Sequence, residues 1–264
     1  MTSEPFWLFA LGLGTGVISG YLGIGGALII IPVLLELFAA RGIPEELRMH
    51  LVVGTSMLAI VGAVTSSTIA HAKAKRVYWP AVPFTAATAV VMSLIGSRLS
   101  ALSSASFLKG FFVIFALCSA AMLLIKPPAP PQEISLHRNR LLAIGLLAGI
   151  VSAYIGVAGG IVMVPLFILW AGVPTEMAAG TSTAVGIITA IVGTTGHILN
   201  GLNVPNRPEG AWGFVLPAVA LPILAGTIFG GPLGSRLNRK LGRNVFRYAF
   251  AVFLLLIAGK VWFW

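Results

Sequence analysis

Two long apolar stretches without a charged residue limit most strongly what this chain can fold into. They cover residues 5–35 and 141–175. A straight helix of about 33 residues spans roughly 50 Å, whereas the hydrocarbon core of a bilayer is about 30 Å thick. Each stretch carries a glycine cluster near its middle, at residues 23–26 and 156–160. Because glycine disfavours a continuous helix, we predict two helices joined by a glycine turn in each stretch, a hairpin that enters and leaves the membrane on one side.

The two stretches are copies of each other, because seven residues are identical in the same order at a constant offset of 133. The pairs are Gly12 and Gly145, Gly16 and Gly149, Ser19 and Ser152, Tyr21 and Tyr154, Gly23 and Gly156, Gly26 and Gly159, and Pro32 and Pro165. Later motifs also recur, with Gly-Thr-Ser at 54–56 and 180–182 and Gly-Ser-Arg-Leu at 96–99 and 234–237. The sequence therefore predicts a duplicated chain.

The predicted division is a first transmembrane repeat at 1–126, a Pro-rich linker at 127–140 and a second transmembrane repeat at 141–264. Hydrophobic residues make up 58% of the chain and charged residues only 9%, against about 25% charged residues in a soluble domain. Eight apolar segments can be drawn, at 5–40, 49–72, 78–97, 105–125, 141–171, 177–199, 211–235 and 245–264. We therefore predict an all-α integral membrane protein with up to ten helices.

The basic residues predict how these helices are oriented. If each glycine-broken stretch is a hairpin and the N-terminus lies outside, 11 of the 17 Lys and Arg residues fall on the inner side. If each stretch crosses once, the count is 9 against 8. The positive-inside rule favours the hairpins. A hairpin and three crossings return the chain to the other side, so the second repeat is predicted to be inverted, as in many secondary transporters.

The glycine clusters also predict a binding site. The second arm of each hairpin begins inside the membrane, where its first N–H groups lack intrahelical partners and the helix dipole places partial positive charge. Two such helix ends, approaching from opposite leaflets, would bind an anion without a charged side chain. The alternative is that the glycines serve helix packing, since Gly12, Gly16 and Gly20 are spaced at four. Both interpretations hold if the glycines spaced at four pack against another helix and the cluster at 23–26 breaks the helix.

Nearby hydroxyl groups complete the predicted substrate-binding set. Its members are Tyr21, Gly23, Gly25, Gly26, Ala27, Thr55, Ser56, Tyr154, Gly156, Gly159, Gly160, Thr181 and Ser182. Alternatively, the Ser and Thr hydroxyls bond their own helix carbonyls or bridge helices, and the tyrosines make interhelical hydrogen bonds. Four further residues are candidates for coupling or for a vestibule: His71, His197, Arg98 and Arg236. Interfacial histidines and arginines that snorkel to headgroups are the simpler explanations.

The acidic residues narrow the function. All seven are glutamates, and all but Glu36 lie in the N-terminal segment or in predicted loops. Cation and proton carriers usually hold carboxylates inside the membrane, so an anion or a neutral solute is favoured. We interpret the net charge of +10 as positive-inside loops and not as a nucleic-acid surface. No metal-ligand spacing or nucleophile elbow is present, so neither a metal, a cofactor nor an enzyme is expected.

The runs at 21–27 and 154–160, each followed by a proline, resemble the TauE/SafE family of sulfite exporters. The Gly-Thr-Ser in each half and the histidine near each segment end match the same family, over essentially the whole chain. The resemblance implies a multi-pass transporter of the bacterial inner membrane for sulfite, sulfoacetate or another sulfur-containing anion. Its partners would be that anion and the lipid bilayer, and a homo-oligomer is allowed.

Several functions remain open at this point. We expect a secondary transporter, in the exporting direction, that works by alternating access around a midplane site. A passive anion channel is the alternative, and a carrier of neutral solutes is a weaker one. A membrane-embedded enzyme or assembly factor would need a reactive cluster that the sequence lacks. Because Ala27 stands where the second copy has Gly160, the two sites need not be equivalent.

Overall fold

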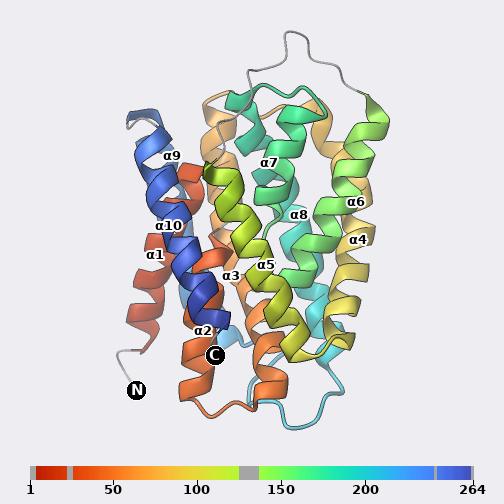
Figure 1. Ribbon diagram of the computed structural model, residues 1–264, viewed down its shortest axis with the longest axis vertical. Helices are drawn as coiled ribbons and strands as arrows, with labels where there is room; N and C mark the ends of the chain where they lie inside the picture. The colour runs from red at the N-terminus through yellow and green to blue at the C-terminus, as the bar shows by residue number, and fades with distance from the viewer. Residues whose placement is uncertain (1–3, 23–25, 125–136, 241–242, 263–264) are drawn as a thin grey trace.

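The computed structural model describes residues 4–22, 26–124, 137–240 and 243–262, and these form a bundle of helices (Figure 1). The elements are α1 (Glu4–Leu22), α2 (Ala27–Ala40), α3 (Glu45–Lys73), the 3-10 turn η1 (Trp79–Ala81), α4 (Val82–Leu102), α5 (Ala105–Leu124), α6 (Arg138–Ile155), α7 (Gly160–Leu169), α8 (Thr175–Gly201), α9 (Pro217–Lys240) and α10 (Arg243–Trp262). Six of the described helices are long and apolar enough to cross a membrane, namely α3, α4 with η1, α5, α6, α8 and α9. The predicted all-α membrane fold is confirmed.

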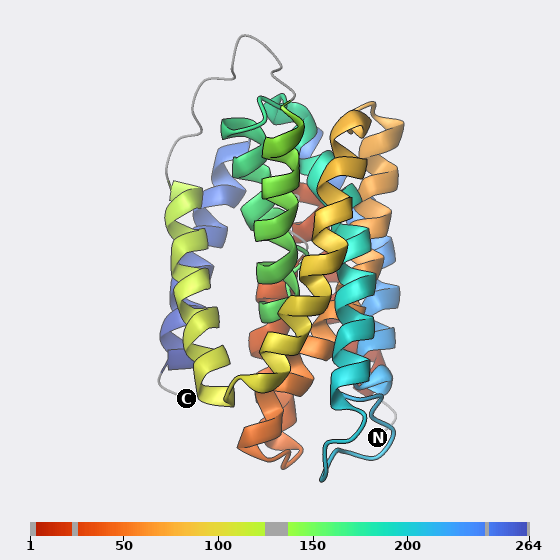
Figure 2. The same ribbon diagram turned by 90° about the vertical axis from the view of Figure 1, so that its right-hand side faces the viewer.

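The two repeats run in opposite directions. In the orientation of Figure 1, α1 rises, α2 descends, and the remaining helices of the first repeat rise, descend and rise. Every step is reversed in the second repeat, where α6 descends, α7 rises and the last three helices descend, rise and descend (Figures 1 and 2). The first hairpin thus opens at the bottom of the molecule and the second at the top. The predicted hairpins and their inverted relationship are confirmed.

Glycine backbone angles explain where the hairpins break. Gly26 precedes α2 with φ +71°, and Gly159 precedes α7 with φ +68°. Gly156 ends α6 with φ +88°. Glycine adopts these left-handed angles without the steric penalty that a Cβ atom brings. Gly23, Gly25 and most of the predicted linker lie outside the described residues.

The predicted seventh segment, 211–235, begins too early. Residues before Pro217 form a tight turn, in which Trp212 and Val215 exchange backbone hydrogen bonds of 2.8 and 2.9 Å. Gly213 within this turn has φ +56°. The apolar character of the turn reflects its contact with α3 and α8 rather than a helical structure, as described below.

The first arm of each hairpin packs on a helix of the other repeat. A Cβ atom placed on Gly12 would overlap the Ile223 carbonyl oxygen of α9, and one on Gly16 would lie 2.7 Å from the Thr227 oxygen. In the second hairpin, a Cβ atom on Gly149 would lie 2.6 Å from the Ala89 oxygen of α4. Small residues let the backbones approach this closely. The predicted packing role of the glycines spaced at four is confirmed, and it interlocks the two repeats.

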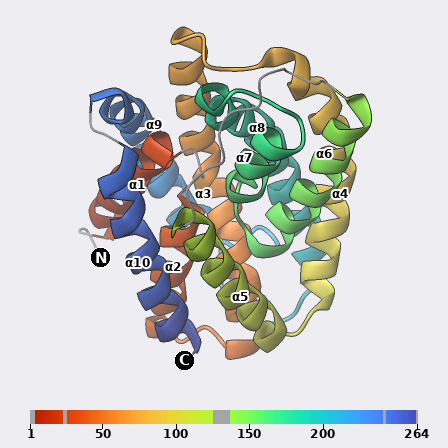
Figure 3. The same ribbon diagram turned by 45° about the horizontal axis from the view of Figure 1, so that its top comes forward.

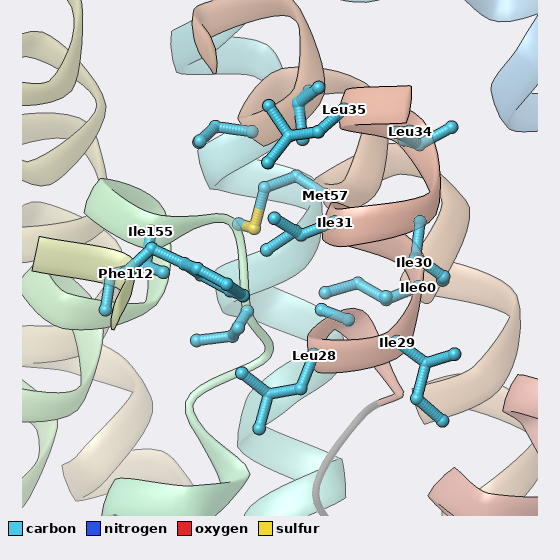
Figure 4. Close-up of a cluster of buried hydrophobic side chains, with 14 of the residues drawn as sticks. Leu28, Ile29, Ile30, Ile31, Leu34, Leu35, Met57, Ile60, Phe112 and Ile155 are labelled. Carbon is cyan, nitrogen blue, oxygen red and sulfur yellow. The ribbon is translucent and has the colours of Figure 1, made fainter. Parts of the chain in front are cut away.

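The short helix α2 lies inside the bundle. Its apolar side chains meet those of α3, α5 and the end of α6, as Figure 4 shows for Leu28, Ile31, Met57, Phe112 and Ile155. On the face in front of α2, α5 of the first repeat lies beside α10 of the second (Figure 3). Large apolar side chains on the outer surface would face lipid, for example those of Phe229 and Leu256. The start of α2 is therefore enclosed by protein.

Candidate functional site

Two helices start in the interior of the protein instead of at its ends. With 14 residues in α2 and 10 in α7, these helices are about 21 and 15 Å long, too short to cross a hydrocarbon core of about 30 Å. Their first residues, Ala27 and Gly160, are buried. Within the described part of the chain, no side chain caps the first N–H groups of either helix. Each helix therefore presents backbone donors without a side-chain cap, and the positive end of its dipole, to the protein interior.

Each N-cap glycine lies against the first arm of its own hairpin. A Cβ atom on Gly26 would lie 3.0 Å from the Thr15 oxygen and 3.4 Å from the Ser19 Cβ atom. A Cβ atom on Gly159 would lie 3.6 Å from the Cβ atom of Ser152, which is the counterpart of Ser19. The two N-cap glycines thus share one backbone geometry, with φ +71° and +68°.

The serines beside the two breaks are both buried. The Ser152 hydroxyl donates to the carbonyl oxygen of Val157, within the second break. The Ser19 hydroxyl is fully buried and has no hydrogen-bond partner among the described residues. Neither serine belongs to the substrate-binding set predicted from the sequence. The signal that could have identified them is their place among the seven repeated identities.

The threonines of the two Gly-Thr-Ser motifs bind backbone groups of the opposite repeat. Thr55 Oγ1 accepts from the Leu216 N–H at 3.0 Å, and Thr181 Oγ1 accepts from the Tyr78 N–H at 2.9 Å. Leu216 and Tyr78 lie just before α9 and α4. The structure thus gives both threonines the bridging role that was the alternative to substrate binding.

The glycines and serines of these motifs also make close contacts. A Cβ atom on Gly54 would overlap the Phe214 carbonyl oxygen, which explains why the turn before α9 packs so closely on α3. Ser56 Oγ lies 2.9 Å from the Gly156 carbonyl oxygen, so a side chain of the first repeat reaches the break of the second. Ser182 Oγ donates to the Ala179 oxygen of its own helix at 2.9 Å.

The predicted tyrosines are both buried. The Tyr154 hydroxyl is 2.7 Å from Ser103 Oγ, in the turn between α4 and α5, and the Tyr154 ring meets Phe111 edge-on at 5.0 Å between centroids. Tyr154 therefore makes the interhelical contact that was the alternative to substrate binding. Tyr21 lies in the last turn of α1, immediately before the first break.

Both predicted histidine side chains are buried inside the protein. His71 of α3 packs against Gly180 of α8, where its Cβ atom would lie 2.9 Å from a Cβ atom placed on the glycine. His197 of α8 packs in the same way against Gly54 of α3, at 3.2 Å. His197 Nε2 also donates to the Ala153 oxygen in the last turn of α6, at 2.8 Å. The histidines thus belong to the contact between the repeats.

The charged candidates lie at the surface. Arg98 and Arg236 are exposed near the ends of α4 and α9, and Arg98 donates to Asn200 Oδ1 at 3.2 Å. Glu36 of α2 forms an exposed ion pair with Lys260 of α10. Among the described residues, no group of three or more His, Cys, Asp or Glu is placed to hold a metal ion. The interior starts of α2 and α7 are buried places where the described chain offers backbone N–H groups without a side-chain cap.

Comparison with known proteins agrees with this architecture. The sequence profile described as "Sulfite exporter TauE/SafE" matches residues 8–261. The chain belongs to the TauE/SafE family. It is 31% identical over 253 residues to a probable membrane transporter protein of Haemophilus influenzae, with 94% of each chain covered. It is also 26% identical to the probable membrane transporter protein YunE of Bacillus subtilis, with 96% of each chain covered.

A further relative is a probable membrane transporter protein of Xylella fastidiosa, 26% identical over 250 residues that cover 92% of this chain and 89% of the relative. These names describe membrane transporters and give no substrate. No solved structure matches the chain significantly. As a TauE/SafE protein, this chain is a multi-pass membrane protein of a transporter family.

Proposed function

We propose that this TauE/SafE protein is a secondary transporter that exports a small sulfur-containing anion, such as sulfite or sulfoacetate, across the bacterial inner membrane. The observation that carries the proposal is the pair of half-length helices, α2 and α7, which start inside the protein from opposite ends. Their uncapped first turns supply hydrogen-bond donors and partial positive charge to an oxyanion. The glycine at each start lets the anion approach the backbone closely.

The charges of the protein support an anionic substrate. The chain has no Asp, and Glu36, the one glutamate within an apolar segment, is bound to Lys260 at the surface. The net charge of +10 favours anions around the protein. A site made from backbone donors needs no buried basic side chain. Such a side chain would be an uncompensated buried charge whenever the site is empty.

The inverted repeats support alternating access. Because the two halves have the same fold with opposite orientation, exchanging their conformations converts a site open to one side into a site open to the other. The substrate-binding set that we propose comprises Tyr21, Gly26 and Ala27 at the first break, and Gly159 and Gly160 at the second. Thr55 and Thr181 support the fold around it.

Transport by the purified protein in liposomes tests this function. We expect uptake of radiolabelled sulfite that saturates with concentration and is accelerated by unlabelled sulfite inside the vesicles, because a carrier returns faster when it is loaded. Sulfoacetate and thiosulfate serve as competitors and chloride as the control anion. Flux that rises linearly with sulfite and shows no acceleration would identify a channel, and flux equal to that of protein-free liposomes would refute the transport of sulfite.

A further inference from the structure

His50 connects three parts of the chain at one end of the bundle. It lies near the start of α3, at the end of the molecule where α1 begins and the first hairpin opens (Figure 1). Its Nδ1 atom is 2.9 Å from the Glu46 carbonyl oxygen of the same helix, and its Nε2 atom is 3.0 Å from the Ser103 carbonyl oxygen in the turn between α4 and α5. The ring also stacks on Phe214, in the turn before α9, with 5.2 Å between centroids. This buried side chain therefore joins elements of both repeats.

The two carbonyl contacts of His50 require a proton on each ring nitrogen. A carbonyl oxygen only accepts hydrogen bonds, whereas a neutral imidazole has one N–H donor and one acceptor nitrogen. Neutral His50 can therefore bond one of the two oxygens, and it turns a lone pair toward the other. The stacked Phe214 ring favours the doubly protonated form as well, because an aromatic face attracts a cation. The contacts of this side chain are thus complete only when the imidazole is positively charged.

No counter-ion accounts for these contacts, since none of the ion pairs among the described residues includes His50. On α3 itself, Glu46 is exposed and Arg48 donates to the Ile43 carbonyl oxygen. The other surrounding elements carry Arg98 on α4, Lys109 on α5, Tyr154 on α6, His197 on α8, and Arg207 and Glu209 in the loop before α9. Within the described chain, a second proton on His50 is therefore held by two neutral oxygen atoms and an aromatic ring.

The equivalent place in the second repeat has no histidine. At the offset of 126 that relates the two Gly-Thr-Ser motifs, Glu176 corresponds to His50. At the offset of 138 that relates the two Gly-Ser-Arg-Leu motifs, Arg76 corresponds to Phe214. The structure agrees with this pairing, because a Cβ atom on the motif glycine of either repeat would overlap the carbonyl oxygen of Arg76 or Phe214. Histidine is the residue type whose charge changes between about pH 5 and 8, so this contact depends on pH at one end of the bundle and has no histidine counterpart at the other.

We propose that His50 is a proton-binding site that clasps this end of the transporter. With two protons, the imidazole bonds α3 to the α4–α5 turn while it lies on the turn before α9, and this end stays closed. When one proton passes to water, one of the two bonds is lost and the helix ends can separate. Because Ser103 Oγ is also 2.7 Å from the Tyr154 hydroxyl, the clasp is connected to the end of α6 beside the second break.

The clasp has a direction across the membrane. The positive-inside count predicts that the end holding His50 faces outward, so acid outside keeps the anion path closed there. Alternating access requires that each end of the bundle opens in turn. The role of the clasp in transport rests on the proposed function, whereas the proton site itself does not and is tested without a substrate.

Thermal unfolding of the purified full-length protein at about pH 5.5 and pH 8 tests the proton site. A histidine that gains hydrogen bonds on protonation stabilises the protein at low pH and loses that contribution as the pH rises. We therefore expect His50→Gln to lower Tm by roughly 2–5 °C more at the lower pH than at the higher one. His137→Gln is the matched control, the same change at an exposed histidine before α6, and it should change Tm equally at both pH values.

Exchange of radiolabelled sulfite across liposomes, with the same pH inside and outside, tests the role of the clasp in transport. Sulfite changes its own charge in this pH range, so the rate of each variant is divided by that of wild type at the same pH. For His50→Gln we expect this ratio to rise about 3- to 10-fold from the higher to the lower pH, because the variant cannot hold this end closed in acid. The ratio for His137→Gln should stay constant.

Nuclear magnetic resonance of wild-type protein with isotope-labelled histidine requires no variant to fold. At the lower pH, we expect one of the four histidines to show two ring N–H groups that exchange slowly with water, because both are buried in hydrogen bonds. The absence of such a histidine, or the same pH dependence of Tm in wild type and His50→Gln, would overturn the proton site. A constant sulfite ratio for His50→Gln would overturn its role in transport. If wild type transports neither sulfite, sulfoacetate nor thiosulfate, the proposed function fails and the clasp loses its role in transport, while Tm and the ring N–H signals still decide whether His50 binds the second proton.

Discussion

Two sets of glycines lie within the same apolar stretch and are used in opposite ways. Gly12 and Gly16 are in the middle of α1, where their missing side chains let α9 approach backbone to backbone. Gly26 lies only ten residues further on, with φ +71°, and it starts a new helix. The first set holds the two repeats together, whereas the second creates an interior helix start. Glycine content alone therefore does not distinguish the two roles. The distance to the packing partner and the backbone angle distinguish them.

The largest effect is expected at the packing glycines. A Cβ atom in Gly12→Ala would overlap the Ile223 backbone, and we expect the free energy of unfolding to fall by about 1–3 kcal/mol, which lowers Tm by roughly 3–10 °C. Gly14→Ala is the matched control in the same helix, because no described atom lies within 4 Å of its added Cβ. There we expect a gain of up to about 1 kcal/mol from helix propensity. Equal Tm values for the two variants in thermal unfolding would contradict the packing role.

The next effect, no larger than the first, is expected where the turn before α9 crosses α3. Thr55→Val leaves the buried Leu216 N–H without its hydroxyl acceptor, and we expect a loss of about 1–3 kcal/mol in the free energy of unfolding. Thr55→Ser keeps the hydroxyl and should recover most of the loss. The apparent affinity for sulfite, measured as the transport KM, should not change. A raised KM with an unchanged Tm would instead return Thr55 to the substrate site.

The smallest effect is expected at the surface of α2. Glu36→Gln removes the exposed ion pair with Lys260, which contributes less than about 1 kcal/mol to stability. Because the account assigns no coupling role to Glu36, sulfite transport and its dependence on a pH gradient should match wild type. A transport rate that no longer responds to the pH gradient would show that Glu36 carries the coupling proton.

Much of the fold could be predicted because the features that determine it are local in the sequence and occur in both repeats. Charge-free stretches longer than the bilayer require a break, and the repeated glycines mark it at Gly26 and Gly159. The spacing of Gly12 and Gly16 likewise identifies a packing face. The start of α9 was missed because the turn at 211–216 is apolar for a tertiary reason, its contact with Gly54 of α3.

The candidate site was less predictable because its roles depend on partners distant in sequence. Thr55 binds the N–H of Leu216, 161 residues away, and no local pattern reveals that pairing. His197 is buried because its ring bonds to Ala153 in another helix. Ser152 donates to the Val157 oxygen within the second break, a contact that depends on how the break is folded.

The claim that an anion binds at the interior start of α2 is tested most directly by sulfite transport in Gly26→Ala and Gly42→Ala. Both glycines have nearly the same backbone angle, φ +71° and +70°, so both substitutions bring a similar strain of about 1–2 kcal/mol. The Cβ atom at Gly42 would meet no described atom within 4 Å, whereas that at Gly26 lies against Thr15 and Ser19. We expect a fall of at least about tenfold in the transport rate for Gly26→Ala and near wild-type transport for Gly42→Ala. Wild-type transport by Gly26→Ala, or an equal loss in both variants, would contradict the account.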